Sequence, residues 1–248
     1  MRVATWNLDH AYNASRPTQL QINKIVEINP DIIVLTETCE NVSLQDYGYT
    51  VSYPEQKNGH EKYCVAIWSR HPILSSPFIQ ETMLAVCAEI DSPLGKVLVY
   101  GTIIPYHGYK GLNGKSSIWE EHYKAIEKQG SDWTALLNTF KNKPLIVAGD
   151  FNQTRDRSKQ TYGTEKGRQL LSDQLTQNKL VCLTEENFGD AGKLSIDPKK
   201  GKVRNNIDHI CTSKSFLKPH YVGAWDHFNH DNLFLSDHNG VYVDFEEK

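Results

Sequence analysis

Short runs of apolar, β-branched and aromatic residues recur along the whole chain, and Gly, Pro, Asn or Asp bounds them. Runs of this length and composition between turn-forming residues predict β-strands. The predicted strands are Val3–Leu8, Asp31–Thr36, Tyr63–Ser69, Ala85–Ile90, Lys96–Ile104, Leu145–Ala148, Asn206–Cys211, Tyr221–Trp225 and Val241–Phe245. Most of the regular structure is therefore expected to be β-sheet.

Three other segments carry apolar residues at three- and four-residue steps, the spacing of one face of an α-helix. We expect these helices over about Pro17–Ile28, Ser117–Phe140 and Lys166–Gln177. Ser117 and Glu120 have the spacing of a capping box at the start of the second helix. Gly130 is a weak point at which that helix can divide into two, because glycine disfavours a helix interior.

Many strands with a few inserted helices favour two sheets packed face to face, with the helices on the outside. The chain has 248 residues, of which 39% are hydrophobic, and it shows no repeat, low-complexity segment or linker. This length and composition are sufficient for a hydrophobic core in one domain. The sequence therefore predicts a single domain over residues 1–248.

Net charge and cysteine content argue against a strongly basic nucleic-acid-binding protein and against a disulfide-rich or zinc-stabilised domain. The net charge of −3 does not indicate bulk attraction to nucleic acid, although a local basic groove can still bind phosphate. Five widely spaced cysteines without a CxxC pair argue against a disulfide framework or a structural zinc site. The first residues read as a strand rather than a secretory leader, and no apolar run is long enough to cross a bilayer. We therefore expect a cytoplasmic, monomeric protein.

Candidate chemistry gathers where the predicted strands end. Gly149 follows the strand Leu145–Ala148, and Asp150 and Asn152 come next, two positions apart. Positions i and i+2 of an extended segment face the same side. A carboxylate that can position water and an amide that can donate to a phosphate can thus meet one substrate. An ordinary Asp/Asn turn explains the pair equally well when it is taken alone.

Three more polar residues lie at the ends of the first two predicted strands. Glu37 comes directly after Asp31–Thr36, and a carboxylate there is a suitable ligand for Mg²⁺ or Mn²⁺. Asn7 and Asp9 repeat the i, i+2 spacing at the end of the first strand. Taken singly, Glu37 is explained better as a solvated strand end, and Asn7 and Asp9 can be turn residues.

His238 precedes the last predicted strand, within the segment Ser-Asp-His-Asn-Gly. An imidazole can donate to a phosphoryl oxygen when protonated or accept a proton when neutral. A carboxylate such as Asp208 would orient it, and the adjacent Asp237 would point elsewhere, toward a metal. By itself, this segment is explained more simply as a loop.

Taken together, these polar residues supply the groups required for metal-assisted phosphoryl transfer. The chain has no Gly-x-Ser-x-Gly that would indicate a serine hydrolase. It also lacks the Walker loop and the GxGxxG that would indicate a nucleotide cofactor. The set therefore predicts a phosphoesterase that uses Mg²⁺, which Mn²⁺ can replace.

Five motifs occur in a fixed order along the chain: Trp6-Asn7-Leu8-Asp9, Thr36-Glu37, Gly149-Asp150-Phe151-Asn152, Asn206-Ile207-Asp208-His209 and Ser236-Asp237-His238. This order resembles the endonuclease/exonuclease/phosphatase (DNase I-like) superfamily, and the Gly-Asp-Phe-Asn and Ser-Asp-His pieces are its specific part. The resemblance implies an α/β fold, a four-layer sandwich of two packed, mostly antiparallel sheets flanked by helices. It also implies that the active site lies at one rim of the sheets.

The resemblance implies a role for each candidate residue. Three acids would belong to the metal site, with Glu37 binding Mg²⁺ and Asp9 and Asp237 beside it. The other residues would act on the water or the phosphate: Asn7 close to the metal, Asp150 on the water, Asn152 on the phosphate, and Asp208 orienting His238, which stabilises the phosphoryl charge.

The chain departs from the family pattern at one position. After the strand Lys96–Ile104, family members commonly place a His or Tyr that touches the scissile phosphate, and the corresponding residue here is Ile103. Tyr106 or His107 in the following loop can take over that role. Alternatively, this aromatic pair simply covers the edge of the core.

Two basic segments flank the proposed site: Arg155, Arg157, Lys159, Lys166 and Arg168, then Lys193, Lys199, Lys200, Lys202 and Arg204. They can hold a phosphate backbone, although solvated loops account for most of them. Arg204, closest to Asp208, is the favoured substrate contact.

Three functions remain open. A nuclease-type phosphodiesterase is expected first, and a phosphatase or phosphodiesterase acting on a small-molecule or lipid phosphate second. A non-catalytic binding module is least favoured, because the acids, the amide and His238 are all present.

Overall fold

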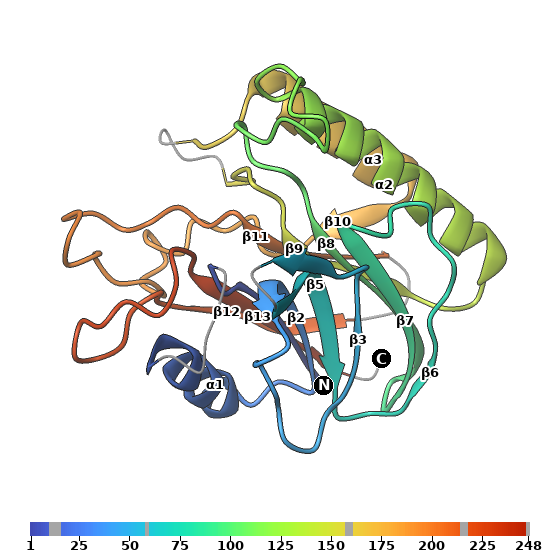
Figure 1. Ribbon diagram of the computed structural model, residues 1–248. Coiled ribbons are helices and arrows are strands. Elements are labelled where there is room, and N and C mark those ends of the chain that lie inside the picture. Colours follow the sequence, from blue (N-terminus) through green and yellow to red (C-terminus); the bar gives the residue numbers. More distant parts are fainter. Residues whose placement is uncertain (10–15, 58–59, 157–160, 214–217, 247–248) are drawn as a thin grey trace.

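The computed structural model describes residues 1–9, 16–57, 60–156, 161–213 and 218–246 (Figure 1). The strands in these ranges are β1 (Arg2–Asn7), β2 (Ile32–Cys39), β3 (Gly48–Val51), β4 (Glu55–Lys57), β5 (His60–Ser69), β6 (Ile73–Ser75), β7 (Ala85–Ser92), β8 (Gly95–Ile103), β9 (Leu145–Asp150), β10 (Leu180–Cys182), β11 (Asp208–Ser213), β12 (Lys218–Trp225) and β13 (Gly240–Glu246). The helices are α1 (Arg16–Ile28), α2 (Glu120–Thr139) and α3 (Glu165–Gln177). No helix in the described part of the chain is long and apolar enough to span a membrane.

The strands form two sheets. One has seven strands in the order β12-β13-β1-β2-β5-β3, with β4 also paired to β5. The other has six strands in the order β10-β11-β9-β8-β7-β6. The pairs β1–β2 and β8–β9 are parallel, and the other described pairs are antiparallel. The expectation of two mostly antiparallel sheets is confirmed.

Apolar side chains from both sheets fill the space between them. They include Val34 and Val65 from the seven-stranded sheet, and Val99 and Ile146 from the six-stranded sheet. Successive residues of a strand face opposite sides, and Leu35, next to Val34, accordingly belongs to a separate core on the outer face. This alternation lets each sheet bury both of its faces.

Helices cover the two outer faces (Figure 1). α1 packs Ile25 into the cluster that contains Trp6, on the outer face of the seven-stranded sheet. α2 and α3 lie side by side and pack Ile126 and Leu171 with Leu145, on the outer face of the six-stranded sheet. The layers are therefore helix, sheet, sheet and helix, which confirms the four-layer sandwich.

All nine predicted strands are present, and four short ones were missed. β3, β4, β6 and β10 contain three or four residues each, too few for a clear alternation of apolar and polar positions. The predicted end of β2 at Thr36 is wrong, because the strand continues through Glu37 to Cys39.

The second predicted helix differs in two ways from the observed α2. The observed α2 begins at Glu120 rather than Ser117, and Trp119 before it has a positive φ and no side-chain cap. One half of the expected capping box is present, because the Ser117 amide donates to Glu120 Oε2 at 2.8 Å. It also runs through Gly130 without dividing. A Cβ at Gly130 would lie 1.9 Å from Oε1 of Gln174 in α3. Glycine at this position lets the two helices approach closely.

One rim of the sandwich collects strand ends from both sheets. β1 and β2 are parallel, with the result that Glu37 in β2 lies beside Asn7 at the end of β1. β9 and β11 are antiparallel and place Asp150 opposite Asp208. β13 is antiparallel to β1, which brings His238, just before β13, to the same rim. These residues come from distant parts of the sequence but share one edge.

Candidate active site

A pocket of about 580 Å³ opens at this rim. Its lining includes eight residues that the sequence singled out: Asp9, Glu37, Tyr106, Asp150, Asn152, Arg204, Asp237 and His238. Asn7 contacts it through Asp150, and Asp208 contacts it through His238. The structure thus brings nearly all of the candidate residues to one place.

Gly149 sets the position of Asp150 at the end of β9. Gly149 has a φ of +147°, and a Cβ there would lie 1.7 Å from the backbone oxygen of Thr102 in β8. Only glycine fits such a close approach between two strands. The sequence Gly-Asp is therefore a structural requirement for delivering this carboxylate to the rim.

Asp150 is almost fully buried and is held by amide groups. Its Oδ2 accepts from Asn7 Nδ2 at 3.0 Å and from Asn152 Nδ2 at 2.8 Å, and its Oδ1 accepts from the Asn152 backbone amide at 2.7 Å. Burial raises the pKa of Asp150 well above its ordinary value, although His238 opposes this. Asn152 Nδ2 also donates to the Ile104 carbonyl at 3.0 Å. Both amide hydrogens of Asn152 are engaged, which makes it a holder of Asp150 in this arrangement.

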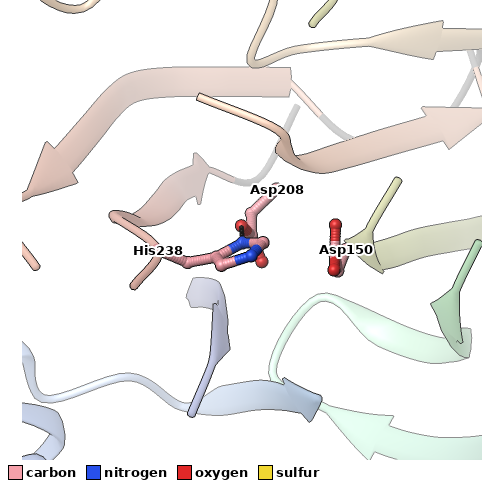
Figure 2. A group of neighbouring side chains, drawn as sticks. All are labelled: Asp150, Asp208 and His238. Carbon is pink, nitrogen blue, oxygen red and sulfur yellow. Dashed lines mark hydrogen bonds and ion pairs between the residues drawn. The ribbon is translucent and has the colours of Figure 1, made fainter. Parts of the chain in front are cut away.

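His238 and Asp208 form a buried hydrogen-bonded pair beside Asp150 (Figure 2). Nδ1 of His238 lies 2.6 Å from Oδ2 of Asp208. Burial lowers the pKa of His238, but the carboxylates of Asp208 and Asp150 outweigh burial and raise it to about 10. Burial raises the pKa of Asp208 above its ordinary value, although His238 opposes this. The short hydrogen bond favours an imidazolium beside an ionised Asp208.

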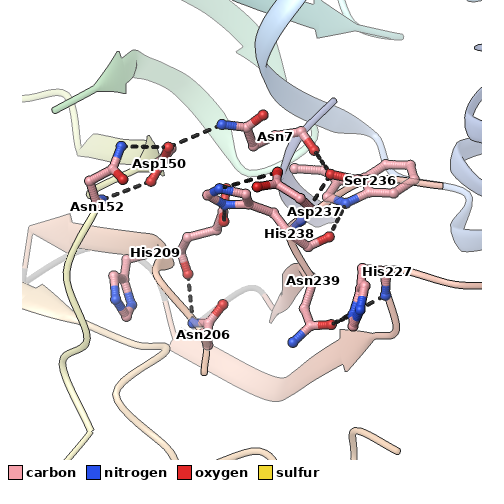
Figure 3. A network of polar contacts seen from close by, with 12 residues as sticks. Asn7, Asp150, Asn152, Asn206, His209, His227, Ser236, Asp237, His238 and Asn239 are labelled. Carbon is pink, nitrogen blue, oxygen red and sulfur yellow. Dashed lines mark hydrogen bonds and ion pairs between the residues drawn. The ribbon is translucent and has the colours of Figure 1, made fainter. Parts of the chain in front are cut away.

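Two residues of the quoted motifs, Trp6 and Ser236, hold the His238 backbone, a role that the sequence did not indicate; Figure 3 shows Ser236 beside His238. Trp6 Nε1 donates to the His238 carbonyl at 2.8 Å. Ser236 Oγ accepts from the His238 amide at 2.9 Å and donates to the Asn7 carbonyl at 2.6 Å. A serine two residues before a histidine is the only sequence signal for this turn.

A second buried His–Asp pair, which the sequence analysis did not identify, contacts the residue that follows His238. His227 Nε2 lies 3.1 Å from Asp197 Oδ2, and its Nδ1 lies 2.8 Å from Asn239 Oδ1. Asn239 follows His238 and donates to the Arg204 carbonyl at 3.0 Å. Arg204 Nη2 in turn lies 3.5 Å from Asp237 Oδ2. This network joins the loop that carries Arg204 to the loop that carries His238.

Three polar residues of the pocket have left-handed backbone conformations. The φ angles are 48° at Asp9, 49° at Glu37 and 48° at Asn152. Non-glycine residues rarely adopt such angles, and they concentrate at functional sites. A short hydrogen bond from the Asp9 amide to Asn7 Oδ1, at 2.8 Å, helps to fix the first of them.

The donor atoms at this rim suit a hard divalent cation. One ligand atom each from Asp150, Asp208 and His238 can lie within 4.8 Å of the others. Oδ1 of Asp208 is buried and has no hydrogen-bond partner among the described residues. Glu37 and Asp237 add carboxylate oxygens to the same pocket, and oxygen donors are those that Mg²⁺ prefers.

The rings of Tyr106 and His107 are in contact, with centroids 5.6 Å apart, but only Tyr106 is among the residues that line the pocket. Tyr106 lines the pocket and is half exposed, at 50%. Nδ1 of His107 lies 3.1 Å from Tyr162 Oη, and its ring packs against Trp119. Ile103 is buried in the core between the sheets, opposite Asp150, and offers no polar atom.

The two basic segments differ in what they contact. In the first, Arg155 donates to Ser172 and Arg168 donates to the Gly163 carbonyl, while Arg157 and Lys159 lie outside the described residues. From the second, Lys200, Lys202 and Arg204 line the pocket. The second segment is the one that places positive charge beside the acids.

Comparisons with known proteins agree with this geometry. A model of the Endonuclease/Exonuclease/phosphatase family matches residues 4–238. No curated protein sequence matches the chain. Solved structures do match it across nearly their whole length.

An AP endonuclease from Archaeoglobus fulgidus has a TM-score of 0.70 and 16% identity, covering 99% of each chain. The 3′ phosphatase NExo from Neisseria, bound to a product DNA hairpin, has a TM-score of 0.66 and 17% identity, covering 99% of each chain. The human Nocturnin catalytic domain with a bound sulfate anion has a TM-score of 0.66 and 21% identity, covering 100% of this chain and 94% of that one. Identities this low support a shared fold, while the family match rests on the sequence itself. The chain belongs to the endonuclease/exonuclease/phosphatase family, whose members are hydrolases acting on phosphate esters.

Proposed function

We propose that the protein is a Mg²⁺-dependent phosphodiesterase of the nuclease type. The observation that carries this is the pairing of His238 with Asp208 at 2.6 Å, in one pocket with Asp150. An acceptor for the proton of water and a donor to the phosphoryl group thus lie close together in one pocket. Residues 1–248 would act as one catalytic domain and as a monomer. The five free cysteines support a cytoplasmic location.

The metal would be held by Glu37 with Asp9 and Asp237, which line the pocket together. When bound, a divalent cation supplies charge stabilisation to the phosphate and lowers the pKa of coordinated water. Mn²⁺ would substitute, because it accepts the same oxygen donors.

Two side chains of the protein would supply the proton acceptor and the hydrogen-bond donor for the reaction. Asp150, fixed by Asn7 and Asn152, orients the attacking water and takes up its proton, for which its raised pKa is suited. His238, protonated and oriented by Asp208, donates to a phosphoryl oxygen as charge develops there.

Nucleic acid is the first candidate substrate because Lys200, Lys202 and Arg204 line the pocket. Such side chains can contact the phosphates on either side of the scissile one. The structural neighbours include an AP endonuclease and a DNA 3′ phosphatase. A small-molecule or lipid phosphate is the second candidate, favoured by a neighbouring pocket without surplus positive charge.

A substrate panel tests the proposal. Supercoiled plasmid, an abasic oligonucleotide, a single-stranded RNA and bis(4-nitrophenyl) phosphate would each be incubated with Mg²⁺, Mn²⁺ or EDTA. Metal-dependent cleavage of a nucleic acid supports the nuclease reading. Cleavage of the aryl diester alone would move the protein to the second candidate. Failure to release product from any of them in either metal would contradict the phosphodiesterase proposal.

A further inference from the structure

A second pocket adjoins the first. Its volume is about 630 Å³, and both pockets include Glu37 and Tyr106 in their walls. The second pocket lies between the segment 81–84, which precedes β7, and the loop 105–116, which follows β8. The two pockets therefore adjoin at Glu37 and Tyr106.

The charges around the second pocket cancel. Its lining contains three lysines and three glutamates. Lys124 Nζ lies 2.9 Å from Glu121, and Lys128 Nζ lies 3.0 Å from Glu81. A polyanion that continued through this pocket would meet no surplus of positive charge. The basic side chains of Lys200, Lys202 and Arg204 line the first pocket instead, together with four carboxylates.

The remaining walls are apolar and aromatic. Tyr63, Tyr106 and Tyr109 contribute rings, and Met83 and Leu112 contribute aliphatic surface. The Leu112 side chain is 79% exposed, and it can therefore be covered by a bound group without rearrangement of the core. Tyrosine rings and a thioether make favourable contacts with a flat aromatic group, and they do so less well with a polar group that retains its hydration water.

One wall is fixed by buried hydrogen bonds. Asp132 of α2, which is almost fully buried, accepts from the backbone amides of Gln80 and Glu81 at 2.7 and 3.1 Å. Glu81 Oε1 accepts from the amides of Met83 and Leu84, each at 3.2 Å. The segment carrying Met83 is thus held in place without a ligand, which reduces the entropy cost of binding one.

We propose that this second pocket binds an uncharged aromatic group of the substrate, such as the base of a nucleoside whose sugar is esterified to the scissile phosphate. The proposal rests on the proposed phosphodiesterase function, since it assigns the neighbour of the reacting phosphate. It also gives the substrate a direction: the aromatic group lies on the Glu37 and Tyr106 side, and any further phosphates lie on the Arg204 side.

Binding of unreactive diesters tests the pocket apart from catalysis. Calorimetry with EDTA present would compare diphenyl phosphate with dimethyl phosphate, which has the same charge and no ring. We expect diphenyl phosphate to bind at least about tenfold more tightly. Leu112→Ser should weaken it about fivefold and leave dimethyl phosphate unchanged. Ile118→Ser is the matched control, because Ile118 is 69% exposed between this loop and α2 but is not among the lining residues of either pocket.

Two results would overturn the inference. One is equal binding of the two diesters, or an equal effect of Leu112→Ser and Ile118→Ser. The other is tighter binding of dihexyl phosphate than of diphenyl phosphate, which would assign the pocket to an alkyl chain. Either can occur in an active enzyme. A different result would contradict the phosphodiesterase proposal: no turnover of any panel substrate in Mg²⁺ or Mn²⁺.

Discussion

Asp150 and Asp208 are direct partners in the register between β9 and β11. The two strands are antiparallel, and the last residue of one therefore faces the first residue of the other at the rim. His238 enters from the other sheet and completes the group, with its ligand atoms within 4.8 Å of the two acids. A register shift of one residue would turn one carboxylate to the opposite face of the sheet and separate the pair.

Removing His238 or Asp150 should abolish most activity without unfolding the protein. We expect His238→Ala and Asp150→Ala each to reduce kcat by about 10²–10⁴-fold, because each removes a group that exchanges a proton or stabilises charge in the transition state. Steady-state kinetics on the best panel substrate would measure this, with circular dichroism to confirm the fold. His230→Ala is the matched control, since the His230 side chain is 89% exposed. Activity within tenfold of wild type in both site variants would contradict the scheme.

Glu37→Gln should act mainly through the metal. The substitution keeps the size of the side chain but replaces a charged oxygen ligand with a neutral amide, which binds a hard cation less well. We expect the Mg²⁺ concentration for half-maximal activity to rise about tenfold or more, with recovery of much of the rate at saturating Mg²⁺. A metal titration of activity measures this. An unchanged Mg²⁺ requirement would remove Glu37 from the metal site.

Gly149→Ala should destabilise the protein strongly. The added Cβ would lie 1.7 Å from the Thr102 oxygen, at a φ of +147°. We expect a loss of at least about 3 kcal/mol of unfolding free energy, from overpacking plus backbone strain. Gly95→Ala separates the two causes, because Gly95 has a φ of +93° but open space around its Cβ position. Its cost should be only about 1–2 kcal/mol in the same urea titration. Equal losses would show that the close approach to β8 does not matter.

Asp197 should make stability depend on pH. Burial raises the pKa of its carboxyl, but hydrogen bonds from the Lys199 and Lys200 amides and from His227 outweigh burial and lower it below the ordinary 3.8. A lowered pKa stabilises the fold above the ordinary value, and the stabilisation is lost as pH falls through the folded-state pKa.

The matching variant is Asp197→Asn, which keeps an acceptor oxygen but removes the charge. At pH 7 it should cost about 1–2 kcal/mol of unfolding free energy. Urea titrations from pH 7 to pH 3 should show that the difference from wild type shrinks toward the acid end. A difference that stays constant across this range would refute the assignment.

Sequence patterns determined the local structure and the chemical groups. Consecutive apolar residues such as Val34 and Leu35 identify strands with two buried faces, because successive side chains of a strand point to opposite sides of the sheet. The order of motifs from Asn7 to His238 indicated the family, because the chemistry of phosphate-ester hydrolysis requires these residue types. Three- and four-residue strands at sheet edges were missed, since they are too short to carry a period.

Tertiary structure alone decided which groups meet. The register of Asp150 with Asp208, the left-handed backbone at Glu37 and the support of His238 by Trp6 depend on contacts between distant segments. Such contacts have no periodic trace in the sequence, because they follow from sheet pairing and from the packing of two sheets. The second His–Asp pair and the neutral pocket beside Tyr106 arise in the same way. The sequence supplied the reactive groups, and the fold set their distances.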